Sequence, residues 1–291
     1  MIKVELGSPL TLELQATIDG LLSELSLGQG EQALADSTFA NLFLFRSVHR
    51  YQFWGGDWPC ISGRSYDGLT HLLPLFDLRT APLEVLFDLI YGYGGFFPLS
   101  GFQLEGLDPQ RFGWTASRDD ADYIYPAHQF VNYQGRLLQK KRNLVKQLQS
   151  AHVVTAKLFS VEAMDESLNV LAQWMHAKGK ATGQADDNAC RDALKLAPTL
   201  GLEGFVYRVN NEVVGFLLFE MLQPGVCVIR FAKALDRFKG IYQHMFQHLC
   251  QSRQEIQWLN FEQDMGIANL RQTKLSYQPA WLLPKYRVYL R

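Results

Sequence analysis

The chain has 291 residues, of which 47% are hydrophobic and 20% charged, and its formal net charge is −1. The length suits two domains of ordinary size, and the composition is typical of a globular protein with a substantial core. A net charge near zero excludes a global electrostatic field directed at nucleic acid or a membrane surface.

The first half of the chain predicts helices followed by strands. Apolar residues at helical spacing predict a helix over 10–25, and a second helix over 38–48 has Asp36 and Ser37 available as caps. Short apolar runs between Gly-containing turns predict an antiparallel meander across 51–76. A helix over 82–91, opening with proline, and a strand over 123–125 complete this half.

The second half repeats this order of elements. A strand over 153–158 precedes helices over 161–177 and 185–196, and strands over 204–209, 213–221 and 226–234 follow. The Asn210-Asn211 turn predicts a hairpin between the first two of those three strands. A helix over 239–251 and a strand over 256–261 come last. The recurrence predicts an α+β protein of two similar domains, 1–133 and 134–291, the second preceded by a basic connecting helix over 135–150.

Several features of the sequence bear on the location of the protein in the cell. The four cysteines are scattered without the paired spacing of a metal or redox site, which predicts reduced thiols and no bound metal. The N-terminal segment lacks the charged and apolar regions of a signal peptide, and no apolar run is long enough to span a bilayer. We therefore expect a cytoplasmic protein without a transmembrane segment.

The positive charges are unevenly distributed. Residues 123–161 and 265–291 contain no acidic residue but several lysines and arginines. Two such segments in a neutral protein predict one local surface for an anionic ligand such as a phosphate. The alternative is two solvated faces that have nothing to do with each other.

One basic residue in the first of these segments lies off the helical pattern. Over 135–150 Lys141 falls within the apolar stripe, whereas Arg142 and Asn143 lie outside it. A lysine on a packed face either extends past it to water or meets an anion. The second reading makes Lys141, Arg142 and Asn143 candidate ligand-binding residues.

A strand-to-helix step follows the strand over 226–234. Arg237 and Gly240 have R-x-x-G spacing at the start of the next helix, and Lys239 lies between them. Free amides in a first helical turn bind phosphate or pyrophosphate, and glycine allows close approach to the backbone. These three residues are a second group of candidates for binding a phosphate.

The stretch from Trp258 to Tyr286 carries the candidate reaction site. A short apolar run ends in Glu262 and Asp264, Gly266 breaks it, and a basic tail follows. Carboxylates at a strand end with cations close behind commonly form a polar site at a sheet edge. The alternative is an ion-pair network that closes the last sheet edge. The candidate catalytic residues are Glu262, Asp264, Arg271 and Lys274, and Tyr277 and Lys285 are candidate substrate contacts.

The strand-to-helix step resembles that of the acyl-CoA N-acyltransferase (GNAT) superfamily, whose loop reads Arg/Gln-x-x-Gly-x-Gly/Ala. Arg237 and Gly240 match this pattern, but Tyr242 stands where the last small residue belongs. Tyr242 therefore lies in the loop that would bind coenzyme A, where the superfamily has a small residue.

A more specific resemblance combines QKKRN at 139–143, RFAKALDRFKGIYQ at 230–243 and NFEQDMGIANLRQTKLSYQP at 260–279. Together these segments resemble the C-terminal domain of phosphatidylglycerol lysyltransferases, and in particular its free-standing relatives of uncharacterised function. The resemblance covers nearly the whole chain and implies two GNAT-like domains in tandem, with mostly antiparallel sheets flanked by helices.

The resemblance also implies a transferase that moves an aminoacyl group from aminoacyl-tRNA to an amine or hydroxyl. Two alternatives stay open: N-acyl transfer from an acyl-CoA, and a non-catalytic module that binds an anionic ligand. Aminoacyl-tRNA and acyl-CoA are thus candidate donors, no cofactor is assigned, and tRNA or another phosphate-bearing molecule is the candidate partner. The donor is already activated, so the expected work of the protein is to position the acceptor and stabilise the oxyanion.

Overall fold

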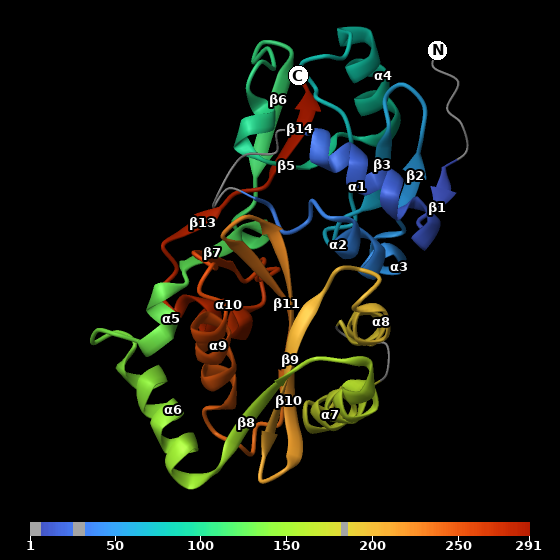
Figure 1. The fold of residues 1–291 in the computed structure, drawn as a ribbon. Helices are drawn as coiled ribbons and strands as arrows, with labels where there is room; N and C mark the ends of the chain where they lie inside the picture. Colours follow the sequence, from blue (N-terminus) through green and yellow to red (C-terminus); the bar gives the residue numbers. More distant parts are fainter. Residues whose placement is uncertain (1–6, 26–32, 182–185) are drawn as a thin grey trace. The chain divides into compact units, whose positions relative to one another are not determined.

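The computed structural model of the chain describes residues 7–25, 33–181 and 186–291. The chain forms two compact units, each built around one seven-stranded sheet. The first unit contains the described part of Met1–Asp122 together with Gln263–Ala268 and Leu282–Arg291. The second unit contains the described part of Tyr123–Glu262 together with Asn269–Trp281. Figure 1 labels the elements of both units.

The sheet of the first unit has the strand order β1-β2-β3-β4-β5-β14-β6. Neighbouring strands pair antiparallel except β4 and β5, which are parallel and meet at Leu72 and Phe96. The strands are β1 (Ser8–Pro9), β2 (Gln52–Trp54), β3 (Cys60–Arg64), β4 (Thr70–Pro74), β5 (Phe96–Leu99), β6 (Phe112–Ala116) and β14 (Tyr286–Leu290). The helices are α1 (Gln15–Glu24), α2 (Phe39–Leu44), α3 (Arg46–His49) and α4 (Leu83–Tyr93), with 3₁₀ turns η1 (Leu12–Leu14), η3 (Gly101–Leu104) and η4 (Arg118–Asp120).

The sheet of the second unit has the order β13-β7-β12-β11-β10-β9-β8. Here β11 and β12 are the parallel pair, and their antiparallel neighbours include β10 and β7. The strands are β7 (Asp122–Pro126), β8 (Val154–Leu158), β9 (Glu203–Val209), β10 (Glu212–Gln223), β11 (Val226–Ala234), β12 (Trp258–Asn260) and β13 (Trp281–Leu283). The helices are α5 (His128–Asn132), α6 (Gln139–Ala151), α7 (Met164–Ala177), α8 (Asp187–Leu196), α9 (Ile241–Ser252) and α10 (Ala268–Leu275), with the 3₁₀ turn η5 (Val161–Ala163).

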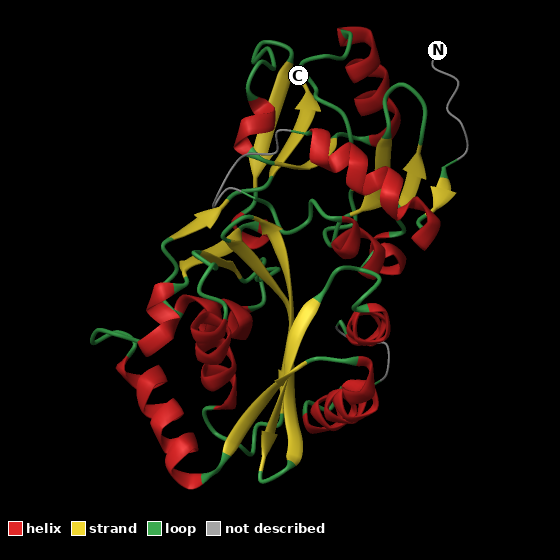
Figure 2. Cartoon of the chain, in the orientation of Figure 1, coloured by secondary structure: helices red, strands yellow, loops and turns green. Residues whose placement is uncertain are grey.

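Helices cover both faces of the second sheet. Figures 1 and 2 show α7 and α8 on one face of β9–β11, and α6 and α9 on the other. Because both faces are covered, the central strands are apolar at almost every position, as in the buried run Val213–Phe219. Arg230 on β11 is a buried charged residue in such a strand, and it therefore needs a specific partner.

The predicted fold class is confirmed: the chain is α+β, with two mostly antiparallel sheets flanked by helices in a GNAT-like arrangement. The hairpin at Asn210-Asn211 is also present. Both asparagines have positive φ (50° and 70°), and Val209 pairs with Glu212 across the turn. Residue 185, where the helix before β9 was expected to begin, lies outside the described residues.

The division into units differs from the predicted division at 133/134. Strand β7 precedes that boundary but pairs with β12 in the second sheet, and β14 at the end of the chain pairs with β5 and β6 in the first. The expected caps of the second helix differ as well. Thr38 caps α2, accepting a hydrogen bond from the Asn41 amide at 3.1 Å, while Asp36 forms an ion pair with Lys285.

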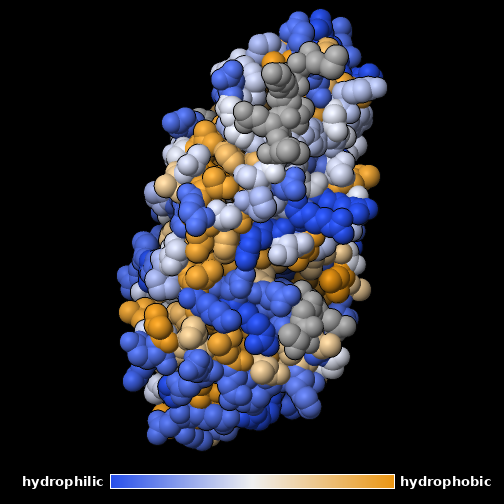
Figure 3. All heavy atoms as spheres, turned by 90° about the vertical axis from the view of Figure 1, so that its right-hand side faces the viewer, coloured by the Kyte–Doolittle hydropathy of each residue, from blue (hydrophilic) through white to orange (hydrophobic). Residues whose placement is uncertain are grey.

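The surface is mixed in character. On the face shown in Figure 3, hydrophobic residues occur in small groups among hydrophilic ones. Among the helices of the described residues, none has the length and apolarity to cross a bilayer.

Candidate active site

The end of β12 is shaped by a tight polar turn. The side chain of Asn260, which is fully buried, accepts a hydrogen bond from the Glu262 amide at 2.7 Å. Glu262 itself has a φ of 57°, a left-handed conformation that costs a residue other than glycine energy and needs local support. Strand β7 contributes that support, because the Tyr123 amide donates to the Glu262 carbonyl at 3.3 Å.

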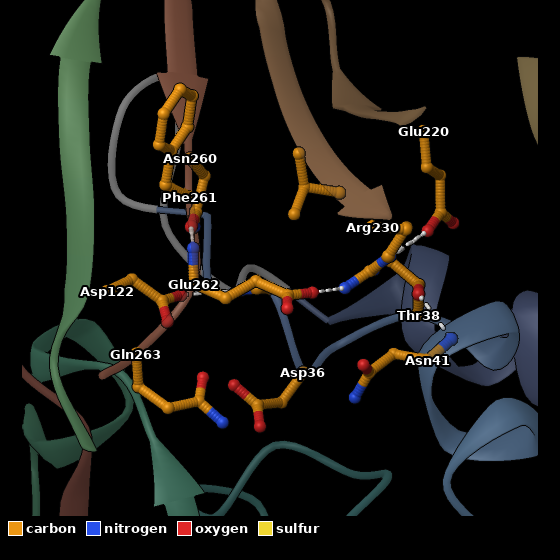
Figure 4. Close-up of polar contacts among 12 residues, drawn as sticks. Asp36, Thr38, Asn41, Asp122, Glu220, Arg230, Asn260, Phe261, Glu262 and Gln263 are labelled. Atoms are coloured by element: carbon orange, nitrogen blue, oxygen red, sulfur yellow. Dashed lines mark hydrogen bonds and ion pairs between the residues drawn. The ribbon is translucent and has the colours of Figure 1, made fainter. Parts of the chain in front are cut away.

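A buried arginine holds the carboxylate of Glu262. Arg230 Nη1 donates to Glu262 Oε1 at 2.7 Å, while its Nε and Nη2 donate to Glu220 Oε2 at 2.9 and 2.7 Å (Figure 4). Burial alone would lower the pKa of Arg230, but the two glutamates raise it above its ordinary value. The arginine side chain is fully buried, whereas that of Glu262 is 22% exposed. Glu262 is therefore fixed in place by its ion pair and remains reachable from solvent.

Lys274 on α10 supports the same turn from its backbone side. Its ammonium donates to the carbonyl oxygens of Phe261 and Glu262, the latter at 3.1 Å, and the side chain is largely buried. Arg271 lies one helical turn earlier and is half-buried. Of the four predicted catalytic residues, Glu262 and Lys274 are thus in direct contact.

Asp264 belongs to the first unit and is fully buried there. Its Oδ2 accepts a hydrogen bond from Arg118 Nη1 at 2.7 Å, and its Oδ1 accepts one from the Gly266 amide at 2.9 Å. The carboxylate therefore closes the turn at Gly266 and ties it to η4.

Lys285 is also a buried residue of the first unit. Its ammonium forms ion pairs with Asp36 and with Asp122, the latter at 2.7 Å, and donates to Gln263 Oε1 at 2.9 Å. Figure 4 shows the polar ends of Asp36 and Gln263 facing each other. Burial alone would lower the pKa of Lys285, but Asp122 and Asp36 raise it. Its three N–H groups thus have three partners.

Lys141 meets an aromatic ring rather than an acid. Its Nζ lies 3.8 Å from the centroid of the buried Tyr277 ring and donates to Ser276 Oγ at 2.7 Å. Burial, and secondarily the charge of Lys140, lowers the pKa of Lys141 to about 8. On the same helix Arg142 donates to the Tyr133 carbonyl, and Asn143 is exposed. Lys141 and Tyr277, predicted separately, therefore lie together.

The strand-to-helix step is filled by the chain itself. The Tyr242 hydroxyl accepts a hydrogen bond from the Ala234 amide at 3.1 Å and donates to the Ala234 carbonyl at 3.2 Å. At Gly240, with φ of 96°, a Cβ atom would lie 2.2 Å from the Leu144 carbonyl oxygen. This glycine is therefore needed where α9 approaches α6. Arg237 is exposed and pairs with Glu212, and Lys239 is exposed.

The basic tail does not form a single basic surface. Lys285 is buried against Asp36 and Asp122, and Arg287 lies 3.7 Å from Asp67. The residues that the sequence prediction missed are the partners: Arg230, Glu220, Arg118, Asp36 and Asp122. Arg230 carried a readable signal, since it interrupts the apolar strand VCVIRFAKA. Asp36 and Asp122 carried no such signal, because their partner, Lys285, lies far from them in the sequence.

Comparison with known proteins places the chain in a family. A sequence model of the family described as "Phosphatidylglycerol lysyltransferase, C-terminal" matches residues 29–289. The chain belongs to this family. It is thus a member of an aminoacyl-transferase family, as the resemblance of its motifs implied.

Solved structures share the fold of this chain over all or nearly all of its length. A conserved protein of unknown function from Bacteroides thetaiotaomicron is 24% identical, with a TM-score of 0.83 and 100% of both chains covered. The structure of L-PGS from Bacillus licheniformis is 17% identical, with a TM-score of 0.65 over 98% of this chain and 93% of that one. An uncharacterised protein of Mycoplasmoides gallisepticum is 23% identical over 196 residues, which are 65% of this chain and 63% of that relative's length.

Proposed function

We propose that this protein transfers an aminoacyl group from an aminoacyl-tRNA to an amine or hydroxyl acceptor. The observation that carries the proposal is the family match over 29–289. The arrangement around Glu262 supports it, because a partly exposed carboxylate held by a buried arginine suits proton transfer at the acceptor.

Two contacts favour aminoacyl-tRNA over an acyl-CoA as donor. Binding of a pyrophosphate at the start of α9 would need free amides and open space beside the backbone. Tyr242 stands where the acyl-CoA loop has its last small residue, with its hydroxyl held at Ala234 at the end of β11, and the Leu144 carbonyl oxygen occupies the space beside Gly240. Acyl-CoA remains the second candidate donor because Arg237 and Gly240 keep the spacing of the acyl-CoA loop.

In the proposed reaction the acceptor nitrogen or oxygen forms a bond to the acyl carbon of the aminoacyl ester. The bond between that carbon and the ribose oxygen of the tRNA breaks, and the acceptor proton passes through Glu262 to the departing oxygen. Arg230 holds Glu262 in the position for this transfer, and Lys274 fixes the backbone that carries it. Since the ester is already activated, positioning and charge stabilisation supply most of the acceleration.

We assign the remaining candidates the following roles. Arg271 stabilises the developing negative charge from α10. Lys141 contacts a phosphate of the tRNA, because its partners, Tyr277 and Ser276, are uncharged. Asp264 and Lys285 are positioning residues of the first unit. The further phosphate contacts that we propose are Arg142, Asn143, Arg237 and Lys239, and the turn at Gly240 orients the last two.

A donor-exchange experiment tests the proposal. The purified chain is incubated separately with bulk tRNA charged with labelled amino acids and with labelled acetyl-CoA, each with phosphatidylglycerol vesicles or a primary amine as acceptor. We expect label to leave the tRNA faster than by hydrolysis in buffer and to appear in an acceptor. Consumption of acetyl-CoA with stable aminoacyl-tRNA would instead support the acyl-CoA reading. Salt-sensitive tRNA binding without any transfer would indicate a binding module.

A further inference from the structure

The first unit contains a pocket with aromatic walls. His49 contacts the rings of Tyr51 and Tyr66, at centroid distances of 5.1 and 4.7 Å, and His71 contacts the rings of Tyr51 and Phe97 at 6.2 and 5.5 Å. All five rings line the pocket, together with the side chains of Asp36, Asp120 and Lys285. Faces of such rings attract cations.

A buried histidine points to a missing ligand. His71 is only 2% exposed, and among the described residues neither of its ring nitrogens has a hydrogen-bond partner of ordinary geometry, although the Leu69 backbone lies close enough to act on its pKa. Burial, with Arg287 and His49, lowers the pKa of His71 to about 4, so the ring is neutral and keeps one acceptor nitrogen. A buried polar group without a hydrogen bond is costly, and a ligand in the pocket would satisfy it.

His49 offers a second acceptor. Its Nδ1 lies 2.8 Å from the Arg64 carbonyl oxygen, which can only accept, so Nδ1 carries the proton. The other ring nitrogen, Nε2, is then left as an acceptor. Burial lowers the pKa of His49 as well, which keeps this ring neutral.

The charges at the pocket favour a cation. The ammonium of Lys285 is fully engaged by Asp36, Asp122 and Gln263. The half-buried carboxylate of Asp120 has no hydrogen bond or ion pair of its own among the described residues, although it lies in the field of Lys285. Arg287, whose guanidinium lies 4.5 Å from the centroid of the Phe97 ring, also acts on Asp120, but it is itself paired with Asp67 at 3.7 Å. Four aspartates therefore stand against the two cations Lys285 and Arg287, which leaves an excess of negative charge.

We propose that this pocket binds a small primary ammonium ion, with Asp120 as its counter-charge. A primary ammonium has three N–H donors, and Asp120, His49 and His71 provide three acceptors. The rings of Tyr51 and Tyr66 supply the cation–π wall around it. The inference rests on the pocket alone, and its test contains no tRNA, so its failure would leave the transfer function untouched.

Calorimetric titration of the full chain with n-butylamine tests the proposal. We expect saturable binding that is weakened at least about tenfold in Asp120→Asn, because a charge-assisted hydrogen bond is lost. Asp88→Asn, which removes an equal charge from the exposed face of α4, is the matched control and should bind as the wild type does. Circular dichroism of both variants confirms that they are folded.

Three probes define the ligand class. The neutral isostere n-butanol should not bind saturably, and tetramethylammonium, which lacks N–H donors, should bind at least about tenfold more weakly than n-butylamine. Potassium ion should not displace the amine at equal concentration. Equal affinity of wild type and Asp120→Asn, absence of saturable amine binding, or full competition by potassium would each overturn the proposal.

Discussion

Each unit contains a buried cation between two carboxylates, but the two clusters are built differently. In the second unit, Arg230 on β11 pairs with Glu220 of the adjacent β10 and with Glu262 beyond the end of adjacent β12. In the first unit, Lys285 pairs with Asp36 and Asp122, which come from distant parts of the sequence.

The exposure of the carboxylates separates their roles. The side chains of Glu220 and Glu262 are 14% and 22% exposed. Of the two partners of Lys285, Asp36 is 17% exposed and Asp122 is fully buried. Removing the cation therefore leaves the glutamates with access to water but leaves Asp122 with none. A buried cation can secure a fold or hold a reactive group in place, and the difference between the two clusters is that one partner of Lys285, Asp122, has no access to water.

The largest loss of stability is expected from Lys285→Met. The substitution leaves the fully buried Asp122 carboxylate without its counter-charge, and breaking a buried pair in this way costs about 3–5 kcal/mol. Urea unfolding measures the change, with Lys239→Met as an exposed control that should stay within about 0.5 kcal/mol of the wild type. A Lys285→Met protein as stable as the control would contradict the structural role of this cluster.

A smaller loss, about 2–3 kcal/mol, is expected from Arg230→Met, because both glutamates can still be partly solvated. The same unfolding measurement checks it. If Arg230→Met destabilised the protein more than Lys285→Met, exposure would not be what distinguishes the clusters.

Tyr242→Phe is expected to cost about 1–2 kcal/mol. The variant leaves the buried Ala234 amide without its hydrogen bond while keeping the ring. Thermal unfolding measures the loss, and coenzyme A binding is followed in parallel. Tight coenzyme A binding by the wild-type protein would show that Tyr242 does not prevent coenzyme A from binding at the step between β11 and α9.

The smallest effect is a pH dependence of tRNA affinity through Lys141. Its pKa is lowered from 10.5 to about 8, so the charge that would contact a phosphate is present below pH 8 and lost as the pH rises through it. We expect a few-fold weaker binding at pH 9 than at pH 7, since one phosphate contact is lost. Filter binding at constant salt measures it, and Lys141→Arg should flatten the profile; an unchanged profile in that variant would assign the pH dependence elsewhere.

Features of the fold that depend on neighbouring residues were predictable from the sequence, whereas pairings between segments far apart in the chain were not. The hairpin at Asn210-Asn211 follows from two adjacent residues that tolerate positive φ. The return of β14 to the first sheet depends on pairing with β5 and β6, which no local pattern encodes. The predicted division at 133/134 cuts the chain once, whereas each of the two units combines segments that are not consecutive in the sequence.

The candidate site shows the same limit. Glu262 and Lys274 were predicted from one stretch, and they do meet, because the loop and α10 lie close in sequence. The ligands of Lys285 were not predicted, since Asp36 was expected to cap a helix and Asp122 lies far from Lys285 in the sequence. Tyr242 was recognised as a departure from the acyl-CoA pattern, but only the structure shows its hydrogen bonds to Ala234.

The most direct test compares two carboxylates on the same arginine. Glu262→Gln and Glu220→Gln each weaken one ion pair of Arg230. Because Glu220 accepts two hydrogen bonds from Arg230 and Glu262 one, the structural effect of Glu220→Gln should be at least as large. The rate of label transfer from aminoacyl-tRNA is measured for both. If Glu262 carries the acceptor proton, Glu262→Gln should be at least about 100-fold slower than Glu220→Gln, the loss typical of a general base. Equal rates for the two variants would contradict that role.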